Sequence, residues 1–325
     1  MELSQSTILV TGGAGLVGST IVDQLLAADP TLRVVVLDDL SRGTALNLEA
    51  ALAGGRVRLV REDIRAFARV RPHFDGVDGV FHQAAIRITR CAQQPRECLE
   101  VLVDGTFNVL TACVEAGVKR LVAASSASIY GMADEFPTPE THPPYNNRTL
   151  YGAAKAANEA MLRSFHEMHG LSYVALRYFN VYGPRMDMFG KYTEVLVRWL
   201  DCLARDEPPR IFGSGRQTMD FVHVDDVARA NLLALRADVA DDVFNIGSGA
   251  ETSLLELLAA LLRVTRNEQV QPVMLPERDV NPVPRRLADV RKADRVLGFR
   301  ARVGLEEGLR SLVAWHKKER LGVRG

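Results

Sequence analysis

Tyr151 and Lys155 are the residues whose types and spacing point most directly to chemistry. They are four residues apart, so on a helix they lie on the same face. A tyrosine with a pKa near ~10 is a poor base at neutral pH. A lysine ammonium about 4 Å away favours the phenolate by roughly 4 kcal/mol, or about three pKa units. The pair therefore predicts a tyrosine that exchanges protons with a substrate, although chance also places this spacing on ordinary helices.

A glycine-rich turn is the second chemical signal. The segment Thr11–Gly18 follows the apolar run Thr7–Val10 and opens a helical pattern over about 15–28. It contains Gly-x-x-Gly-x-x-Gly from Gly12 and Gly-x-Gly-x-x-Gly from Gly13. Such glycines let the backbone turn sharply and approach a pyrophosphate that rests on the helix N-terminus. A strand before the turn and a helix after it are the context that this motif requires.

Acidic and small residues follow the next strands. Asp38 ends the run that begins at Arg33 and lies 20 residues after Gly18. A carboxylate there accepts the adenosine ribose hydroxyls and repels a 2′-phosphate, which favours NAD over NADP. Arg42 would favour NADP, and the alternative for Asp38 is a turn residue at a strand end. The segments 63–64 and 83–85 end two further strands, where doubly wound sheets bind ligands.

The elements that must position these residues alternate between apolar strands and helices. Short strands are predicted at 7–10, 33–37, 57–60, 79–82, 120–124 and 172–176. The longest intervening helix is predicted over 95–117, and another over 151–169. Apolar strands separated by helices indicate a parallel sheet covered on both faces. The expected fold class is therefore α/β, a Rossmann-type doubly wound parallel sheet.

The pattern changes after Arg177. Proline and glycine flank one helix at about 193–204, whereas the helix 225–236 and the strand 243–246 resemble the earlier α/β units. The segment 275–284 is predicted to be a loop over a cleft, and two amphipathic stretches follow at 290–297 and 305–320. We predict an NAD-binding domain of residues 1–177 plus about 214–248. Residues 178–213 and 249–325 would form a smaller, mainly C-terminal substrate-binding domain.

Composition excludes several classes of function. Of 325 residues, 47% are hydrophobic and 25% charged, and 40 basic residues balance 40 acidic ones. This balance predicts no nucleic-acid or membrane partner. There is no apolar run long enough for a membrane span and no signal peptide is expected. The four cysteines, Cys91, Cys98, Cys113 and Cys202, lack metal or Cys-x-x-Cys spacing, so we expect them to be reduced in a cytoplasmic protein. No metal site is predicted.

Six motifs occur in a characteristic order. They are the segments 11–18, 63–64, 82–85, 125–131, 151–155 and 176–185. With them the chain resembles, over nearly its whole length, an extended short-chain dehydrogenase/reductase of the NAD-dependent nucleotide-sugar epimerase/dehydratase family. The resemblance implies that Tyr151 is the general base, and that Lys155 holds the nicotinamide ribose and lowers the Tyr151 pKa. Ser126 would hydrogen-bond the same sugar oxygen, the alternative being a strand-end serine bonded to backbone.

The resemblance also implies the binding residues. NAD is expected to contact Gly12, Gly15, Leu16, Val17, Gly18, Asp38, Asp39, Ser41, Arg42, Gly43, Asp63, Ile64, Gln83, Ala84, Ala85, Tyr151, Lys155 and Tyr178. A nucleotide sugar, expected to be UDP-linked, would contact Arg87, Ser126, Ser128, Asn180, Arg185, Arg216, Arg278 and Arg286. The helices that begin at Pro95 and Tyr151 resemble those of the family's dimer interface, so a homodimer is expected.

The residues after Ser126 distinguish the family's reactions. Dehydratases of the family carry an Asp-Glu pair there, and UDP-glucuronate decarboxylases a Glu, to move a proton at the neighbouring carbon. This chain has Ala127 and Ser128, which resembles the UDP-sugar 4-epimerases. A UDP-glucuronate decarboxylase, a nucleotide-sugar dehydratase and a 4-ketoreductase are the enzymatic alternatives. A non-catalytic protein that senses NAD is the alternative from another class.

Two positions depart from the epimerase pattern. Met219 stands where the family usually has an arginine that contacts the diphosphate, and Arg216 is a candidate substitute. Leu102 stands where an asparagine is usual before Gly105-Thr106. Arg278 or the pair Arg285-Arg286 could contact the diphosphate, and the spacing leaves this choice open.

Overall fold

Seven short strands pair in parallel to form the central sheet of the computed structural model, which describes residues 3–188, 194–277 and 283–322. They are β1 (Thr7–Thr11), β2 (Arg33–Asp38), β3 (Val57–Arg61), β4 (Gly79–His82), β5 (Arg120–Ser126), β6 (Tyr173–Tyr178) and β10 (Asp242–Ile246). Their order is β10-β6-β5-β4-β1-β2-β3, and every pairing is parallel. The chain runs outward from β1 in both directions, so the prediction of a doubly wound Rossmann-type sheet is confirmed.

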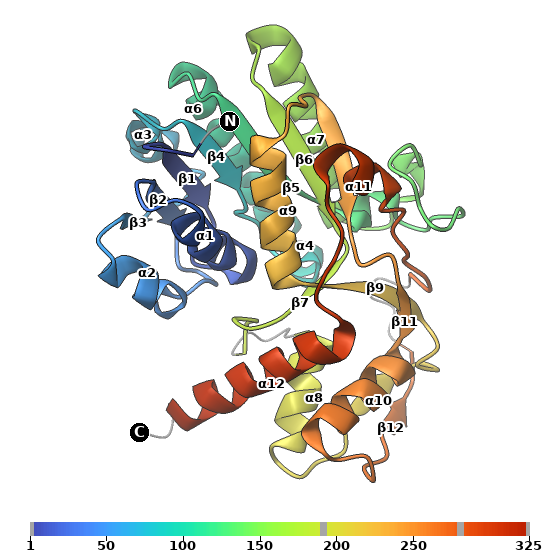
Figure 1. Ribbon diagram of the computed structural model, residues 1–325. Helices are drawn as coiled ribbons and strands as arrows, with labels where there is room; N and C mark the ends of the chain where they lie inside the picture. The colour runs from blue at the N-terminus through green and yellow to red at the C-terminus, as the bar shows by residue number, and fades with distance from the viewer. Residues whose placement is uncertain (1–2, 189–193, 278–282, 323–325) are drawn as a thin grey trace.

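Helices cover both faces of this sheet (Figure 1). One face carries α1 (Leu16–Ala28), α9 (Val224–Arg236) and α11 (Arg291–Leu297), whose apolar side chains share a core with β1, β2 and β10. The other face carries α3 (Phe67–Val70), α6 (Gly105–Glu115) and α7 (Leu150–His169), which enclose a second core. The short helix α2 (Glu49–Ala53) lies near β3. Burial on both faces explains why these strands are apolar throughout.

Helix α7 has clear end signals. The Thr149 side chain accepts a hydrogen bond from the Gly152 amide at its start, and Gly170 adopts a left-handed conformation at its end. These are ordinary capping arrangements. They fix the register of the helix that carries Tyr151 and Lys155.

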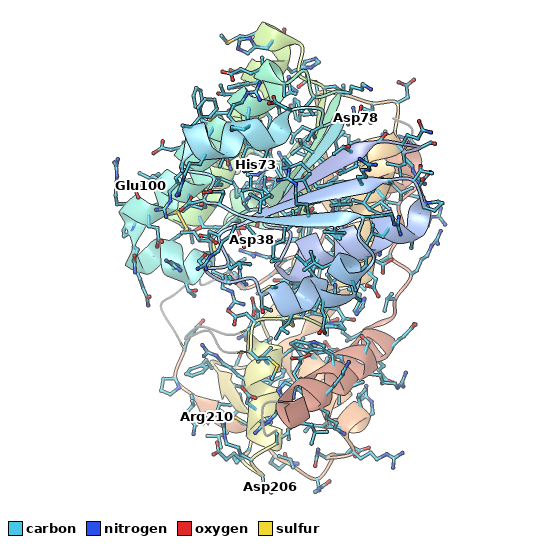
Figure 2. All side chains as sticks on the ribbon, turned by 90° about the vertical axis from the view of Figure 1, so that its left-hand side faces the viewer. Asp38, His73, Asp78, Glu100, Asp206 and Arg210 are labelled. Atoms are coloured by element: carbon cyan, nitrogen blue, oxygen red, sulfur yellow. A yellow bond between two sulfur atoms is a disulfide. The ribbon has the colours of Figure 1, made fainter. Side chains whose placement is uncertain are left out.

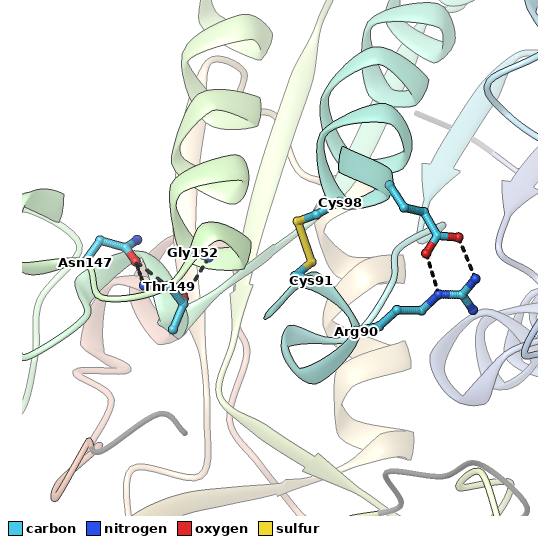
Figure 3. Close-up of a disulfide and its surroundings, with 7 residues drawn as sticks. Arg90, Cys91, Cys98, Asn147, Thr149 and Gly152 are labelled. Atoms are coloured by element: carbon cyan, nitrogen blue, oxygen red, sulfur yellow. Dashed lines mark hydrogen bonds and ion pairs between the residues drawn. A yellow bond between two sulfur atoms is a disulfide. The ribbon is translucent and has the colours of Figure 1, made fainter. Parts of the chain in front are cut away.

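The predicted helix 95–117 is interrupted. It consists of α5 (Pro95–Leu99), a π-helical turn (Glu100–Asp104) and α6, and it is preceded by α4 (Ile88–Gln93). A disulfide between Cys91 and Cys98 joins α4 to α5 (Figure 3). Our expectation of reduced cysteines was therefore wrong for this pair, because folding brings two buried sulfur atoms together that no spacing rule connects. Cys113 and Cys202 are free and buried.

A smaller lobe lies beyond the carboxyl ends of the strands. It contains α8 (Val195–Leu203), α10 (Leu254–Thr265) and α12 (Leu305–Gly322), and the paired strands β8 (Arg210–Phe212) and β12 (Val273–Leu275). Its core includes Trp199, Leu257 and Leu309. A sheet of β7 (Asn180–Tyr182), β9 (Thr218–His223) and β11 (Glu251–Ser253) adjoins it. One-turn 3₁₀ segments occur at Ala45–Leu48, Arg71–Phe74, Ala127–Tyr130 and Pro144–Asn146.

The direction of the strands places the predicted site between the lobes. Asp78 precedes β4 at the amino end of the sheet, whereas Asp38 ends β2 on the side that faces the smaller lobe (Figure 2). Helix α11 packs on the large sheet, although the predicted boundary near 249 assigned it to the smaller domain. In the part of the chain that is described, no helix is long and apolar enough to cross a bilayer.

Candidate active site

The glycine turn forms a cradle at the N-terminus of α1. Gly12 has φ +66°, and a Cβ added to it would lie 2.7 Å from the backbone nitrogen of Ala84. A Cβ on Gly18 would lie 2.3 Å from the carbonyl oxygen of Gly12. The first turn of α1, which contains Leu16 and Val17, has no side-chain cap and no acidic residue. Its orphan amides therefore suit an anion such as a pyrophosphate.

Asp38 lies beside this turn. Its carboxylate accepts hydrogen bonds from the Ala14 and Leu40 amides, each at 2.9 Å, and burial raises its pKa, against the lowering effect of those hydrogen bonds. Gly43 packs against Ala14, where an added Cβ would lie 2.7 Å from backbone. The strand end and the turn therefore form one surface, as a bound dinucleotide requires.

Two other predicted cofactor residues at strand ends have local partners. The Asp39 carboxylate accepts hydrogen bonds from the amide and hydroxyl of Ser41. Asp63 is ion-paired with Arg65, and Ile64 is buried against Gly105. These contacts hold the loops after β2 and β3 without involving the glycine turn.

The ends of β4 and β6 are joined by a polar cluster. The Tyr178 hydroxyl donates to Gln83 and also contacts Asn231, each at 3.0 Å. Ala84 and Ala85 follow Gln83 directly and are half-buried. The cluster brings the predicted cofactor residue Tyr178 to the strand end that carries these small side chains. Asn231 was not predicted, because it lies mid-helix in α9 and no local motif marks it.

A buried histidine supports the same end of β4. The His82 ring contacts the Thr11 hydroxyl at 2.7 Å and the Thr106 hydroxyl at 3.0 Å. Burial and the Lys155 charge lower the pKa of His82 to about 3, so its ring is neutral. Asn158 donates to Thr106 at 3.3 Å. The sequence did not predict roles for His82, Thr106 or Asn158. Of the three, only His82 lies in a motif that the sequence marked, His82-Gln83-Ala84-Ala85.

Ser126, Tyr151 and Lys155 come together at the carboxyl end of β5. The Ser126 side chain lies close enough to Tyr151 to lower the pKa of its phenol, and it accepts from the Ser128 amide at 3.1 Å. The Lys155 Nζ atom lies 6.0 Å from the Tyr151 ring centroid and donates to the Ala124 carbonyl at 2.7 Å. The three side chains that the sequence selected as a reacting group are therefore neighbours.

The electrostatics of Tyr151 differ from the expectation. Burial raises the pKa of Tyr151, and the Ser126 hydrogen bond and the charges of Arg42 and Arg286 lower it. The sequence assigned this lowering to Lys155. Burial lowers the pKa of Lys155 to about 8, while the Glu159 carboxylate raises it. Arg42 and Arg286 come from segments more than a hundred residues from Tyr151, so no spacing in the sequence predicts their approach.

Cations gather around this group. Arg87 is ion-paired with Glu194 at 2.8 Å and Asp187 at 3.5 Å, and Arg42 lies within 3.8 Å of both carboxylates. The Arg286 Nε atom is buried with no hydrogen-bond partner among the described residues, and burial lowers the pKa of its guanidinium to about 10. A buried guanidinium whose Nε atom has no partner among the described residues suits an anionic ligand near the phenol.

A pocket of about 840 Å³ opens in the smaller lobe next to these cations. Arg216 and Met219 line it. Two further lining residues lie close in sequence to the cations: Thr89 is two residues after Arg87, and Pro284 is two residues before Arg286. This volume suits a ligand of nucleotide size. A second pocket, of about 510 Å³, lies at Asp78 near the amino ends of the strands, where doubly wound sheets do not bind ligands.

The remaining predicted substrate residues are dispersed. Asn180 donates to the Asp220 carbonyl at 3.1 Å, and Ser128 is buried behind Ser126. Arg185 is ion-paired with Asp23 of α1 at 2.7 Å. Arg278 lies outside the described residues. Arg285 pairs with Glu251 at 2.7 Å and stacks on Phe136, which leaves Arg286 as the arginine of that pair directed toward Tyr151.

Asp220 anchors the strand that borders the pocket. Its side chain is fully buried and accepts hydrogen bonds from the amides of Ser248, Gly249 and Ala288 at 2.6–3.2 Å. Burial raises the pKa of this carboxyl against the lowering effect of those hydrogen bonds. Asp220 therefore joins β9, beside Met219, to two other chain segments.

Comparison with known proteins identifies relatives along the whole chain. A family model described as the NAD dependent epimerase/dehydratase family matches residues 8–247. A UDP-glucose 4-epimerase of Mycolicibacterium smegmatis is 35% identical over 319 residues, 96% of this chain and 98% of that protein. A dTDP-glucose 4,6-dehydratase of an Actinoplanes species is 33% identical over 320 residues, 96% and 98% of the two chains. The crystal structure of UDP-glucose 4-epimerase from Thermotoga maritima, with UDP-glucose, has a TM-score of 0.90 and 35% identity. That alignment covers 97% of this chain and 99% of the other.

Proposed function

Because the chain belongs to the NAD dependent epimerase/dehydratase family, we propose that it is a nucleotide-sugar 4-epimerase. The observation that carries the proposal is the cluster of Ser126, Tyr151 and Lys155. In the sequence, Ser126 is followed by Ala127 and Ser128. The cluster can take a proton from a sugar hydroxyl. The two following residues offer no carboxylate for elimination or decarboxylation at a neighbouring carbon. The family's cofactor is NAD, as the sequence predicted.

The chain's residues perform the proton chemistry. The Tyr151 phenolate removes the C4 hydroxyl proton while the Ser126 hydroxyl holds the same oxygen, and Lys155 supplies positive charge beside the phenolate. NAD, when bound at the cradle of Gly12 and Gly18, supplies the acceptor for the C4 hydride and later its donor. Tyr151 would return the proton to the C4 oxygen once the C4 ketone has presented its opposite face to the cofactor. Proton and hydride both return, so no redox equivalent is consumed.

The cations and the pocket support binding of a substrate through a nucleoside diphosphate group. The Nε atom of Arg286 has no hydrogen-bond partner in the part of the chain that the structure describes, and a guanidinium binds phosphate oxygens in a two-pronged geometry. Arg216 is exposed on the pocket wall close to Met219, which supports its role as a substitute for the usual arginine. The relatives named for UDP-glucose favour a UDP-linked sugar.

Product analysis distinguishes this proposal from its alternatives. Incubation with UDP-glucose, UDP-galactose or UDP-glucuronate should give the C4 epimer of one of them by NMR, without net NADH. Carbon dioxide from UDP-glucuronate would instead establish a decarboxylase, a 4-keto-6-deoxy product a dehydratase, and stoichiometric consumption of reduced cofactor a ketoreductase. NAD binding without turnover of any nucleotide sugar would favour a sensor protein.

The assembly and location remain proposals. Exposed Leu99 and Phe107 lie on α5 and α6, the region predicted to form the dimer interface. Sedimentation at micromolar concentration should give a homodimer, and a monomer there would reject it. A cytoplasmic location is also proposed, and fractionation of cells that express the chain tests it.

A further inference from the structure

A buried ion pair lies directly behind the reacting side chains. Glu159 follows Lys155 by one turn of α7 and Tyr151 by two, so the three share a helix face. The Arg177 guanidinium donates to both carboxylate oxygens of Glu159, at 2.9 and 2.6 Å. The Glu159 side chain is only 13% exposed and the Arg177 side chain only 9%. This is a bidentate pair removed from solvent.

The pair is connected to the strands that carry the other site residues. Glu159 also accepts a hydrogen bond from Ser125, the residue before Ser126. Arg177, the residue before Tyr178, donates to the Tyr130 hydroxyl at 2.9 Å. The network therefore joins β5, β6 and α7, the elements that carry Ser126, Tyr178 and the Tyr151–Lys155 pair.

Stability alone does not account for such a pair. Removing two charges from water is costly, and apolar residues of similar volume often stabilise a core equally well. A carboxylate at this position has a second effect, because its charge favours the protonated form of Lys155. This opposes the burial that lowers the pKa of Lys155 to about 8.

Three titratable groups face the Lys155 ammonium. Tyr151 and Glu159 lie on its own helix, and His82 faces it from β4 with a pKa lowered to about 3 by burial and by the Lys155 charge. Because His82 is neutral, Glu159 is the nearby anion on the described residues that offsets the burial of Lys155.

We propose that Glu159, held by Arg177 and Ser125, is a positioning residue that keeps Lys155 charged beside Tyr151. The inference rests on the proposed role of Tyr151 and Lys155 in hydride transfer from a sugar. Glu159 does not touch the reacting atoms; it acts through Lys155.

The test replaces Glu159 by glutamine, which preserves size and one acceptor oxygen, removes the charge, and turns the other acceptor into a donor. The chain has only six lysines, so a ¹³C-lysine NMR titration, assigned with Lys155→Arg, resolves the Lys155 signal without requiring turnover. The Lys155 midpoint should fall by about one pH unit or more, equivalent to at least a tenfold shift in its protonation equilibrium. The alkaline limb of turnover should move to lower pH by a similar amount, with little change in KM.

Matched variants separate charge from packing. Glu159→Asp keeps the charge and should keep the wild-type Lys155 midpoint. Arg163→Gln breaks an exposed pair with Asp241 one turn further along α7 and should change neither measurement. If Glu159→Gln fails to fold because Arg177 is left unpaired, Glu159→Gln/Arg177→Met removes both charges and should fold with the lowered midpoint.

The inference is overturned if the folded glutamine variant, or the double variant in its place, retains the wild-type Lys155 midpoint. It is also overturned if Glu159→Asp lowers the midpoint as far as Glu159→Gln does. A wild-type chain that epimerises no nucleotide sugar refutes the proposed function instead, and the NMR titration still decides the role of Glu159.

Discussion

Alanine substitutions at Gly18 and Gly15 should separate packing from cofactor contact within one turn. A Cβ at Gly18 would lie 2.3 Å from the Gly12 carbonyl oxygen and 2.6 Å from the Gly13 Cα atom. Both are backbone atoms that cannot move aside without shifting the turn. Overpacking of this kind costs about 1–3 kcal/mol, so Gly18→Ala should lower the free energy of unfolding by about that amount.

Gly15 provides the matched control. It has φ −82°, and a Cβ there would meet only the Gly12 carbonyl oxygen, at 3.4 Å. As an N-cap replacement, Gly15→Ala should change the free energy of unfolding by less than about 1 kcal/mol. The added methyl group would nevertheless stand at the N-terminus of α1, where the pyrophosphate is expected. NAD affinity should therefore fall about tenfold, or about 1.4 kcal/mol.

Urea unfolding followed by circular dichroism measures the first quantity, and isothermal titration with NAD measures the second. We expect Gly18→Ala to lose both stability and NAD affinity, and Gly15→Ala to lose affinity alone. A Gly18→Ala variant as stable as the wild type would refute the packing argument. Wild-type NAD affinity in Gly15→Ala would refute the placement of the pyrophosphate.

Three further outcomes are expected. Tyr151→Phe should retain NAD but lose at least about two decades of turnover, and near-normal turnover would reject Tyr151 as the base. Arg286→Gln removes a cation that lowers the Tyr151 pKa, so the acid limb of the pH–rate profile should move to higher pH. Arg285→Gln is the control and should leave the limb in place. An unmoved limb in Arg286→Gln, or an equal shift in Arg285→Gln, would contradict a role of Arg286 in the Tyr151 pKa. In urea melts, dithiothreitol should lower the free energy of unfolding of the wild type by about 2–3 kcal/mol. It should leave that of a Cys91→Ala/Cys98→Ala variant unchanged. Equal sensitivity of both proteins to dithiothreitol would exclude a stabilising disulfide.

The sequence predicted the large sheet well because its strands are locally marked. The runs at β1, β2 and β10 are apolar and adjoin glycine turns or helices, so their boundaries were correct to within one or two residues. Helix α10 was not predicted although it begins with a Ser253–Glu256 capping box. The three-stranded sheet of β7, β9 and β11 was missed because β7 and β11 have only three residues each and the strands pair across distant segments.

The cluster of Ser126, Tyr151 and Lys155 was predictable to the extent that motifs are local. Tyr151 and Lys155 are four residues apart, and Ser126 lies near the end of an apolar strand. The cations that act on Tyr151 were not predictable as such, because Arg42 and Arg286 approach it only in the folded chain. The same holds for Arg177, whose carboxylate partner is 18 residues away on another element.

Strand β9 has a consequence for how this enzyme class can diversify. Neighbouring residues of a strand point to opposite sides, so Met219 borders the pocket while the next residue, Asp220, is buried among three backbone amides. A substitution at 219 therefore changes the wall of the pocket, while the buried hydrogen bonds of Asp220 hold the strand in place. A family built on this arrangement can exchange an arginine for a methionine in one step, and selection for a new substrate need not compete with selection for a folded chain.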